Sequence, residues 1–500
     1  MSRQPQPAAA WPTISWRQLH TWGGLLLGWL LLPVFVTGTL AVFEHELSRW
    51  MQPEIPSRPE VSRAEALDRA VAFLQQQAPT AQSWMVSWPS ARDPALSASW
   101  GAGRAMEQAY LDPRDGQPMA VRDTLGGHLF VDFHYELLAG KVGLWLVGVA
   151  GLAMVIALIT GTLIHARLFK DFFAFRPAAG GHKAWLDGHN LSGVLTLPFL
   201  LMITYSGVSL SFTTLYPATT NQLFDGNGGK LRSAVVRDFS RPPAGEAAPL
   251  LLPLSRYLPL TDARFGEGNS RLLRVVRPGD GHAHVEVMRS AEDQLALIAH
   301  RLAFDGVSGQ PLDEQFDFRP LTVAFRAMAG LHVGHYGGLA LSWIYFICGA
   351  AGCLLIASGL LLYPLKRRQR YGPSRWLSSV DAINQISIAG SLQACALVLW
   401  ANRLLPLELS ARPQWEVALL CSGWLLSALL ACWPRAGWRV QLGLAGLLWL
   451  LLPAVDLLTV SDHWWAAWAA GERVFVVVDL LALALGLALL LMAGRRRADR

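Results

Sequence analysis

Charged residues are scarce in this chain of 500 residues. Asp, Glu, Lys and Arg make up 16% of the sequence, whereas hydrophobic residues make up 52% and the chain contains 21 Trp. Soluble domains carry about 25% charged residues. This composition argues against a soluble enzyme and indicates a protein with many membrane-spanning segments. The small positive surplus lies mostly in a few short loops, so it does not indicate nucleic-acid binding.

Cysteine is also rare, and it is absent from the polar parts of the chain. All five cysteines lie in apolar stretches: Cys348, Cys353, Cys395, Cys421 and Cys432. The two long polar segments therefore have no disulfide framework. The motif Cys-x-x-Cys-His does not occur either, which excludes covalently attached c-type haem.

Eight apolar segments are long enough to cross a membrane, since one crossing needs about 20 apolar residues. They are residues 22–43, 142–164, 191–212, 338–363, 383–401, 415–433, 438–459 and 473–493. The first is too long for the apolar core of a signal peptide, and no small-residue cleavage site follows it. We therefore expect it to remain as a membrane anchor.

Basic loops predict the orientation of these spans. Residues 165–177, 366–375 and 494–500 are rich in Lys and Arg, and eight crossings place all three on one side. Such loops stay in the cytoplasm. We therefore expect a multi-pass protein of the cytoplasmic (inner) membrane, embedded in the lipid bilayer, with both termini in the cytoplasm.

Two polar segments, 46–133 and 213–331, separate the first four spans and are expected to form two external α+β domains. In the first, Ser62 is a candidate N-cap of a helix. Each segment also contains an Asp followed four residues later by Gly-Gln-Pro, at Asp112 and Asp305. Alone, this pattern is a common hairpin turn, but its recurrence before spans 2 and 4 indicates a duplication. The other expected parts are 1–45 (cytoplasmic tail and span 1), 134–212 (spans 2 and 3 with a basic loop), 332–366 (span 4), 367–382 (a basic cytoplasmic loop) and 383–500 (a four-span extension with a basic tail).

Histidine and glycine spacing supports the duplication. His20 precedes Gly38 by 18 residues and His189 precedes Gly207 by 18, whereas His134 precedes Gly161 by 27 and His332 precedes Gly359 by 27. Each of these glycines follows Thr or Ser. The alternating offsets predict a parallel repeat of span, external domain and span, related by a pseudo-two-fold axis along the membrane normal. The expected fold is thus a polytopic α-helical membrane protein with a duplicated four-helix core, two external domains and a four-helix C-terminal extension.

The histidines form two groups on this topology. His20, His165 and His189 gather at the cytoplasmic end of the bundle, and the external end holds His45, His134, His332 and His335. Ionisable residues in a membrane are costly and indicate function, although a single histidine can simply lie at the lipid interface. Two groups at opposite ends suggest two sites.

Paired imidazoles suit haem iron, and glycine lets a flat macrocycle or another helix approach closely. Ordinary helix packing explains each glycine equally well. The repeat makes His20 with His189, and His134 with His332, the simplest ligand pairs. His165 and His45 lack counterparts in the other half of the repeat but lie at suitable depths, so the pairing stays open.

Two haems, one near each face, could carry electrons across the membrane in steps. The sequence contains no GxGxxG motif after a strand and no GxxxxGK[ST] motif, so it has no obvious nicotinamide or ATP site. Electrons would have to come from a separate cytosolic reductase or from membrane quinol.

Several motifs in order resemble the PepSY-associated transmembrane family, and more narrowly its iron-uptake and siderophore-reductase branch. The resemblance covers about residues 12–366 and rests on "LHTWGGLLLGWLLLPVFVTGTLAVFEHELSRWMQPE", "FHYELLAGKVG", "ITGTLIHARLFKDFFAFRP", "DGHNLSGVLTLPFLLMITYSG" and "LHVGHYGGLALSW". It implies a bacterial cytoplasmic-membrane protein with two b-type haems that reduces ferric siderophores, or other ferric chelates, in the periplasm. The haem-ligand candidates that it implies are His20, His134, His165, His189 and His332, with His45 and His335 less strongly supported. Residues 380–500 depart from the family core, and their role stays open between stabilising the bundle, binding quinone and docking a partner.

Two other functions fit the same sequence. One is a haem-free regulatory or scaffold protein whose external domains bind peptides, proteases or uptake components. The other is the cytochrome b subunit of a periplasmic oxidoreductase with a different substrate. A haem spectrum separates the first of these alternatives from the haem-containing functions.

Overall fold

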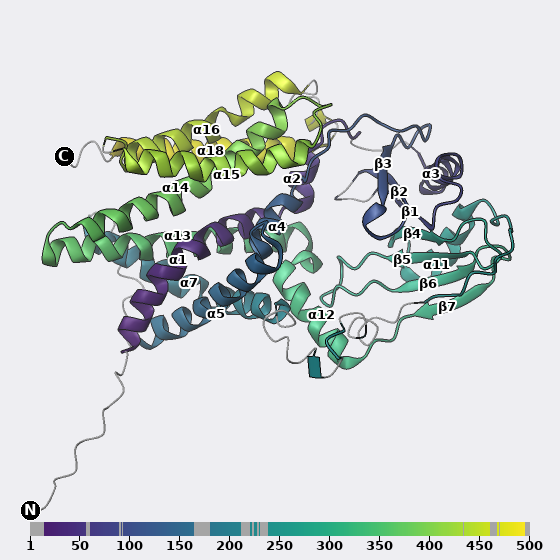
Figure 1. Ribbon diagram of the computed structural model, residues 1–500, viewed down its shortest axis with the longest axis horizontal. Coiled ribbons are helices and arrows are strands. Elements are labelled where there is room, and N and C mark those ends of the chain that lie inside the picture. Colours follow the sequence, from purple (N-terminus) through teal and green to yellow (C-terminus); the bar gives the residue numbers. More distant parts are fainter. Residues whose placement is uncertain are drawn as a thin grey trace, which may run out of the picture.

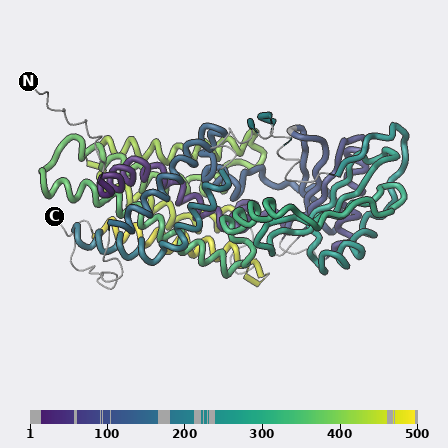
Figure 2. The backbone as a smooth tube through the Cα atoms, turned by 90° about the horizontal axis from the view of Figure 1, so that it is seen from below, coloured from purple at the N-terminus to yellow at the C-terminus, as the bar shows by residue number. Residues whose placement is uncertain are grey.

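The computed structural model describes residues 15–56, 61–89, 92, 94–164, 181–211, 221–222, 225–227, 230, 239–433, 435–460, 468–469 and 471–495. The molecule is elongated, with a helix bundle at one end and a β-sheet at the other (Figures 1 and 2). We call the end of the bundle nearest the sheet the sheet end and the opposite end the far end. Helix α1 begins and helix α18 finishes at the far end (Figure 1).

The described residues include eight helices that are long and apolar enough to cross a membrane. They are α1 (Trp16–Ala41), α5 (Gly140–Ile164), α7 (Gly181–Leu210), α13 (Gly338–Tyr371), α14 (Arg375–Leu404), α15 (Arg412–Cys432), α16 (Trp438–Thr459) and α18 (Arg473–Arg495). The predicted multi-pass membrane protein with eight spans is therefore confirmed. Helix α7 begins ten residues before the predicted apolar segment, because its first turns are helical but carry polar residues such as His182 and Asp187.

Helices α1, α5, α7 and α13 form the four-helix core. Helix α1 packs against α5 and α13, and α7 packs against the same two helices. At the far end, Ser15 and Gln18 form a capping box that satisfies the first backbone N–H groups of α1. Buried apolar side chains from all four helices meet in the interior, among them Leu32, Met154, Leu200 and Leu360.

Three short helices connect this core to the sheet. Helix α2 (Glu44–Met51) follows α1, α4 (His128–Glu136) packs against α1, and α12 (Pro320–Val333) packs against α7. The sequence placed His134 and His332 at the beginning of spans 2 and 4, but the structure places them on α4 and α12. Left-handed backbone at Leu137 (φ 53°) and Gly334 (φ 76°) ends these two helices before the spans begin.

The two polar segments form one seven-stranded antiparallel sheet. The first segment supplies β1 (Ser83–Ser87), β2 (Leu96–Trp100) and β3 (Glu107–Leu111), and the second supplies β4 (Ser270–Val276), β5 (His284–Arg289), β6 (Arg301–Asp305) and β7 (Pro311–Gln315). The strand order is β3-β2-β1-β4-β5-β6-β7. Strands β1 and β4 join the halves, with Trp84 opposite Val275 and Val86 opposite Leu273.

One hydrophobic core contains residues from both halves of the sheet. Helix α3 (Arg63–Gln77) contributes Leu67 and Leu74, α11 (Tyr257–Phe265) contributes Leu258, and both meet Trp84 and Val287 from the two halves. The predicted cap of α3 is confirmed, since the Ser62 hydroxyl accepts a hydrogen bond from the Glu65 N–H. The two predicted external segments therefore share one continuous sheet and one hydrophobic core.

The duplicated turn has the same backbone geometry in both segments. The N–H of Gly116 donates to the Asp112 carbonyl at 2.8 Å, and the N–H of Gly309 donates to the Asp305 carbonyl at 2.9 Å. Both glycines have a left-handed φ, 75° and 77°, which glycine adopts without strain. The sequence repeat therefore corresponds to a repeated turn.

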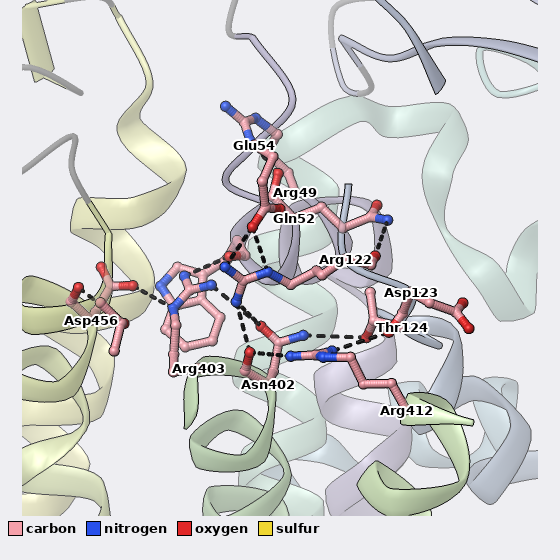
Figure 3. A network of polar contacts seen from close by, with 12 residues as sticks. Arg49, Gln52, Glu54, Arg122, Asp123, Thr124, Asn402, Arg403, Arg412 and Asp456 are labelled. Carbon is pink, nitrogen blue, oxygen red and sulfur yellow. Dashed lines mark hydrogen bonds and ion pairs between the residues drawn. The ribbon is translucent and has the colours of Figure 1, made fainter. Parts of the chain in front are cut away.

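The C-terminal extension is held to the rest of the protein by α14, which packs against α1 and α13. At the sheet end, a buried polar network ties it to α2 and to the segment before α4 (Figure 3). Arg403 donates to Asp456 and to the Trp50 carbonyl, both at 2.6 Å, and Arg122 donates to the Asn402 carbonyl at 2.7 Å. Charges inside a membrane protein are costly unless paired, so these contacts fix how the extension sits on the core.

Candidate functional site

Two histidines face each other at the far end of the core. His20 lies on α1 and His189 on α7, with ring centroids 6.5 Å apart and ring planes at 74°. His20 Nδ1 lies 3.0 Å from the Ala157 carbonyl oxygen, and His189 Nδ1 lies 3.0 Å from that of Leu355. A carbonyl can only accept a hydrogen bond, so both contacts place the proton on Nδ1 and the lone pair on Nε2.

A second histidine pair lies at the sheet end. The rings of His134 on α4 and His332 on α12 have centroids 5.9 Å apart and planes at 29°. His134 Nδ1 lies 2.8 Å from the Val34 carbonyl oxygen, and His332 Nδ1 lies 2.9 Å from that of Ile203. The two pairs therefore have the same hydrogen-bonding arrangement. We call them the far pair and the sheet-side pair.

Each of the four rings lies against a glycine of another helix. A Cβ atom would lie 2.5 Å from the nearest ring atom at Gly38, 2.7 Å at Gly207 and 3.1 Å at Gly161 and Gly359. The rings concerned belong to His134, His332, His20 and His189, respectively. Any larger residue at Gly38 or Gly207 would displace the ring that it faces.

The carbonyl that orients each ring lies four residues before the glycine that the ring contacts. This holds for Val34 and Gly38, Ala157 and Gly161, Ile203 and Gly207, and Leu355 and Gly359. The hydroxyl before the glycine adds a second contact in three cases: Thr160 at 3.2 Å from His20, Ser358 at 3.1 Å from His189 and Ser206 at 3.2 Å from His332. The Thr-Gly and Ser-Gly pairs are thus part of four equivalent histidine-binding notches.

Each pair borders a cavity. The far cavity, of about 630 Å³, is lined by His20, His189 and their glycines, and by Arg17, Lys366, Arg367 and Arg370. The sheet-side cavity, of about 440 Å³, is lined by His134, His332 and mainly apolar residues. Leu31 of α1 lines both, so the two cavities follow one another along the bundle.

His45 and His335 form a third group, with ring centroids 5.5 Å apart. His45 Nε2 lies 3.3 Å from Oε1 of Glu292, which the sequence did not single out. The hydrogen bond with Glu292 raises the pKa of His45, and the same bond lowers the pKa of Glu292 to about 2. His335 also borders the sheet-side cavity. His165, the remaining candidate, lies outside the described residues.

The comparisons identify the family. A model of the PepSY-associated TM region matches residues 17–367. The chain belongs to this family. Uncharacterized protein PA4219 of Pseudomonas aeruginosa is similar to this chain, with 30% identity over 346 residues that cover 64% of this chain and 84% of that protein. The family match runs from α1 into α13, so it includes the sheet and both histidine pairs and excludes the C-terminal extension.

Sequence reasoning missed three parts of the site. The repeat related each histidine to a glycine by sequence spacing, but His20 contacts Gly161 and His134 contacts Gly38. The basic residues at 366–370 predict the orientation of the spans, but three of them, Lys366, Arg367 and Arg370, also line the far cavity. No motif surrounds Glu292. The Thr-Gly and Ser-Gly pairs were the one signal that could have revealed the notches.

Proposed function

We propose that this PepSY-associated membrane protein binds two b-type haems and passes electrons along its core to a ferric chelate, such as a ferric siderophore, at the sheet end. His20 and His189 would hold one haem, and His134 and His332 the other. The observation that carries the proposal is the shared arrangement of the two pairs, in which backbone carbonyls fix all four rings in glycine notches.

The spacing of the rings fits a metal between them. Two imidazoles bound at about 2 Å on opposite sides of one iron have ring centres about 6 Å apart. The observed separations are 6.5 Å and 5.9 Å. Within the described residues, neither pair belongs to a group of three His, Cys, Asp or Glu ligands. Two protein ligands with space between them favour haem over a mononuclear zinc site, which takes three or four.

Both cavities suit a flat, mostly apolar group, and the far cavity also suits its two carboxylates. Apolar side chains such as Leu25, Leu197 and Ile356 line the far cavity, and its basic residues could pair with the carboxylates. In each notch, a backbone carbonyl accepts a hydrogen bond from Nδ1 of the histidine. This hydrogen bond fixes the ring orientation and raises the basicity of Nε2, which favours metal binding by Nε2. The residues present therefore fit haem at both pairs.

When bound, each haem iron would supply a one-electron Fe(III)/Fe(II) couple. The chain's own contribution is to hold the two pairs at different depths: His20 and Gly38 on α1 are 18 residues, or about 27 Å, apart along the helix. The basic residues at the far end favour a cytoplasmic location for that end. Electrons would then enter from a cytosolic reductase or quinol and leave in the periplasm.

Reduction of a ferric chelate takes one electron per iron. The product, Fe(II), binds hard oxygen chelators less tightly than Fe(III), so the metal is released. The sheet is the largest folded unit at the exit end, and we assign chelate binding to it.

The test is the haem content and redox behaviour of the purified full-length chain. We expect two haems per chain, one after His20→Ala and one after His134→Ala, with no change after His282→Ala, a control in the turn before β5. Dithionite-reduced protein should be reoxidised by a ferric siderophore. Protein that is colourless after expression with ample haem would refute the proposal and favour a regulatory or scaffold function. Haem that is not reoxidised would indicate another substrate.

A further inference from the structure

Three side chains from distant parts of the chain converge beside the sheet-side cavity. His45 lies on α2, His335 on the short 3-10 helix η4 (His335–Gly337), and Glu292 between β5 and β6. One ligand atom from each lies within 4.8 Å of the other two. All three residues are partly exposed, with 25% exposure for the His45 side chain and 40% for Glu292. An ion could therefore reach the cluster from solution.

The donor set is that of a transition-metal site. Two imidazole nitrogens and one carboxylate oxygen bind Fe(II), Co(II) and Zn(II), and three ligands leave further coordination positions for water or exchange. Mg(II) and Ca(II) prefer oxygen ligands. Ligand atoms on one such ion lie about 3–4 Å apart, so a small inward movement of these side chains would complete the site.

A simple ion pair does not explain the third member of the cluster. Nearby, His128 and Glu44 form such a pair at 3.0 Å, and Arg92 pairs with Glu46 at 2.8 Å. Neither contact brings a second imidazole. In the cluster, His335 lies beside His45, which already contacts Glu292. If both rings were protonated, they would repel each other. A shared metal ion gives both imidazoles a favourable role.

We propose that His45, His335 and Glu292 bind a divalent first-row transition-metal ion, and that Fe(II) is its physiological occupant. The geometry of the three side chains supports a transition-metal site without reference to the proposed function. The choice of Fe(II) rests on the proposed function, which produces ferrous ion at this end of the protein. His335 lines the sheet-side cavity, so the site would receive iron close to where it is released.

The experiment is an anaerobic titration of the full-length protein, without a histidine tag, using Co(II) as the spectroscopic probe. We expect one Co(II) per chain with visible absorption bands from nitrogen and oxygen ligands. His45→Ala and Glu292→Gln should each weaken binding at least about tenfold. His128→Ala is the matched control, because it removes a neighbouring histidine of similar pairing, and it should leave binding unchanged.

The outcomes separate this proposal from the haem proposal. Equal Co(II) affinity in the parent, His45→Ala, His335→Ala and Glu292→Gln proteins would overturn the metal site, whatever the haem content. Co(II) binding by a haem-free protein would support the metal site and refute the proposed function. Absence of Fe(II) binding at this site in an anaerobic titration with Fe(II) alone would overturn Fe(II) as the occupant, because a competition with Co(II) would favour Co(II) at any such nitrogen and oxygen site. Unchanged haem spectra and melting curves would show that the variants fold.

Discussion

Replacing Gly38 with alanine puts a methyl group where the His134 ring now lies. The new Cβ would be 2.5 Å from His134 Nδ1, whereas an ordinary contact is about 3.5 Å. The ring must therefore retreat by about 1 Å. That movement breaks its 2.8 Å hydrogen bond to the Val34 carbonyl and turns the imidazole away from His332.

The energetic terms can be compared. Overpacking costs about 1–3 kcal/mol and the lost hydrogen bond about 1 kcal/mol, while alanine in place of glycine gains up to about 1 kcal/mol of helix stability. The net expectation is a destabilisation of about 1–3 kcal/mol. Haem at the sheet-side pair should be lost, and haem at the far pair should remain.

The four notches provide a graded series for this assay. Gly207→Ala should behave like Gly38→Ala, because its Cβ would lie 2.7 Å from His332, whereas Gly161→Ala and Gly359→Ala, at 3.1 Å, should be milder. Gly443→Ala on α16 is the control, since no atom lies within 4 Å of the new Cβ. The measurement is haem per chain with the thermal midpoint. Full haem content in Gly38→Ala, or a larger loss in Gly161→Ala, would refute the role assigned to the notches.

Three further predictions concern the scaffold. Arg403→Ala leaves Asp456 buried without its 2.6 Å partner. It should lower the free energy of unfolding, measured by thermal unfolding, by about 3–5 kcal/mol. A decrease below about 1 kcal/mol would contradict the role of Arg403 in docking the extension. Trp84→Ala should lower the free energy of unfolding by about 3–5 kcal/mol and raise the rate of amide hydrogen exchange in both β1 and β4. Faster exchange in β1 alone would contradict the shared sheet. Burial alone would raise the pKa of Asp305, but hydrogen bonds from the Ser308 backbone and Arg241 hold it at about 2. Because this pKa lies below the ordinary value, ionised Asp305 should stabilise the sheet above about pH 4. That contribution should be lost as the pH falls toward 2. Asp305→Asn should abolish this part of the pH dependence of the free energy of unfolding.

The membrane-spanning helices were predictable because they depend on local properties of the chain. Runs of about 20 apolar residues define spans regardless of their neighbours, and the capping box at Ser62 involves residues three positions apart. The turn at Asp112 and its repeat at Asp305 are likewise local, which is why the sequence pattern and the structure agree there.

Contacts between distant segments were harder to predict. The pairing of β1 with β4 joins residues that are 185 to 193 positions apart. Nothing in either strand pattern selects that partner over an edge facing solvent. For the same reason, spacing revealed that histidines and glycines repeat but not that His134 contacts Gly38. Glu292 approaches His45 only because the shared sheet brings the β5–β6 connection to the bundle.

The most direct test of the two-haem account is electron paramagnetic resonance of the oxidised protein. Two low-spin signals from bis-imidazole haem are predicted. The far pair, with ring planes at 74°, should give the more anisotropic signal, and the sheet-side pair, at 29°, the less anisotropic one. His189→Ala should remove only the first and His332→Ala only the second. The absence of any low-spin haem signal, or one signal that survives in both variants, would contradict the account.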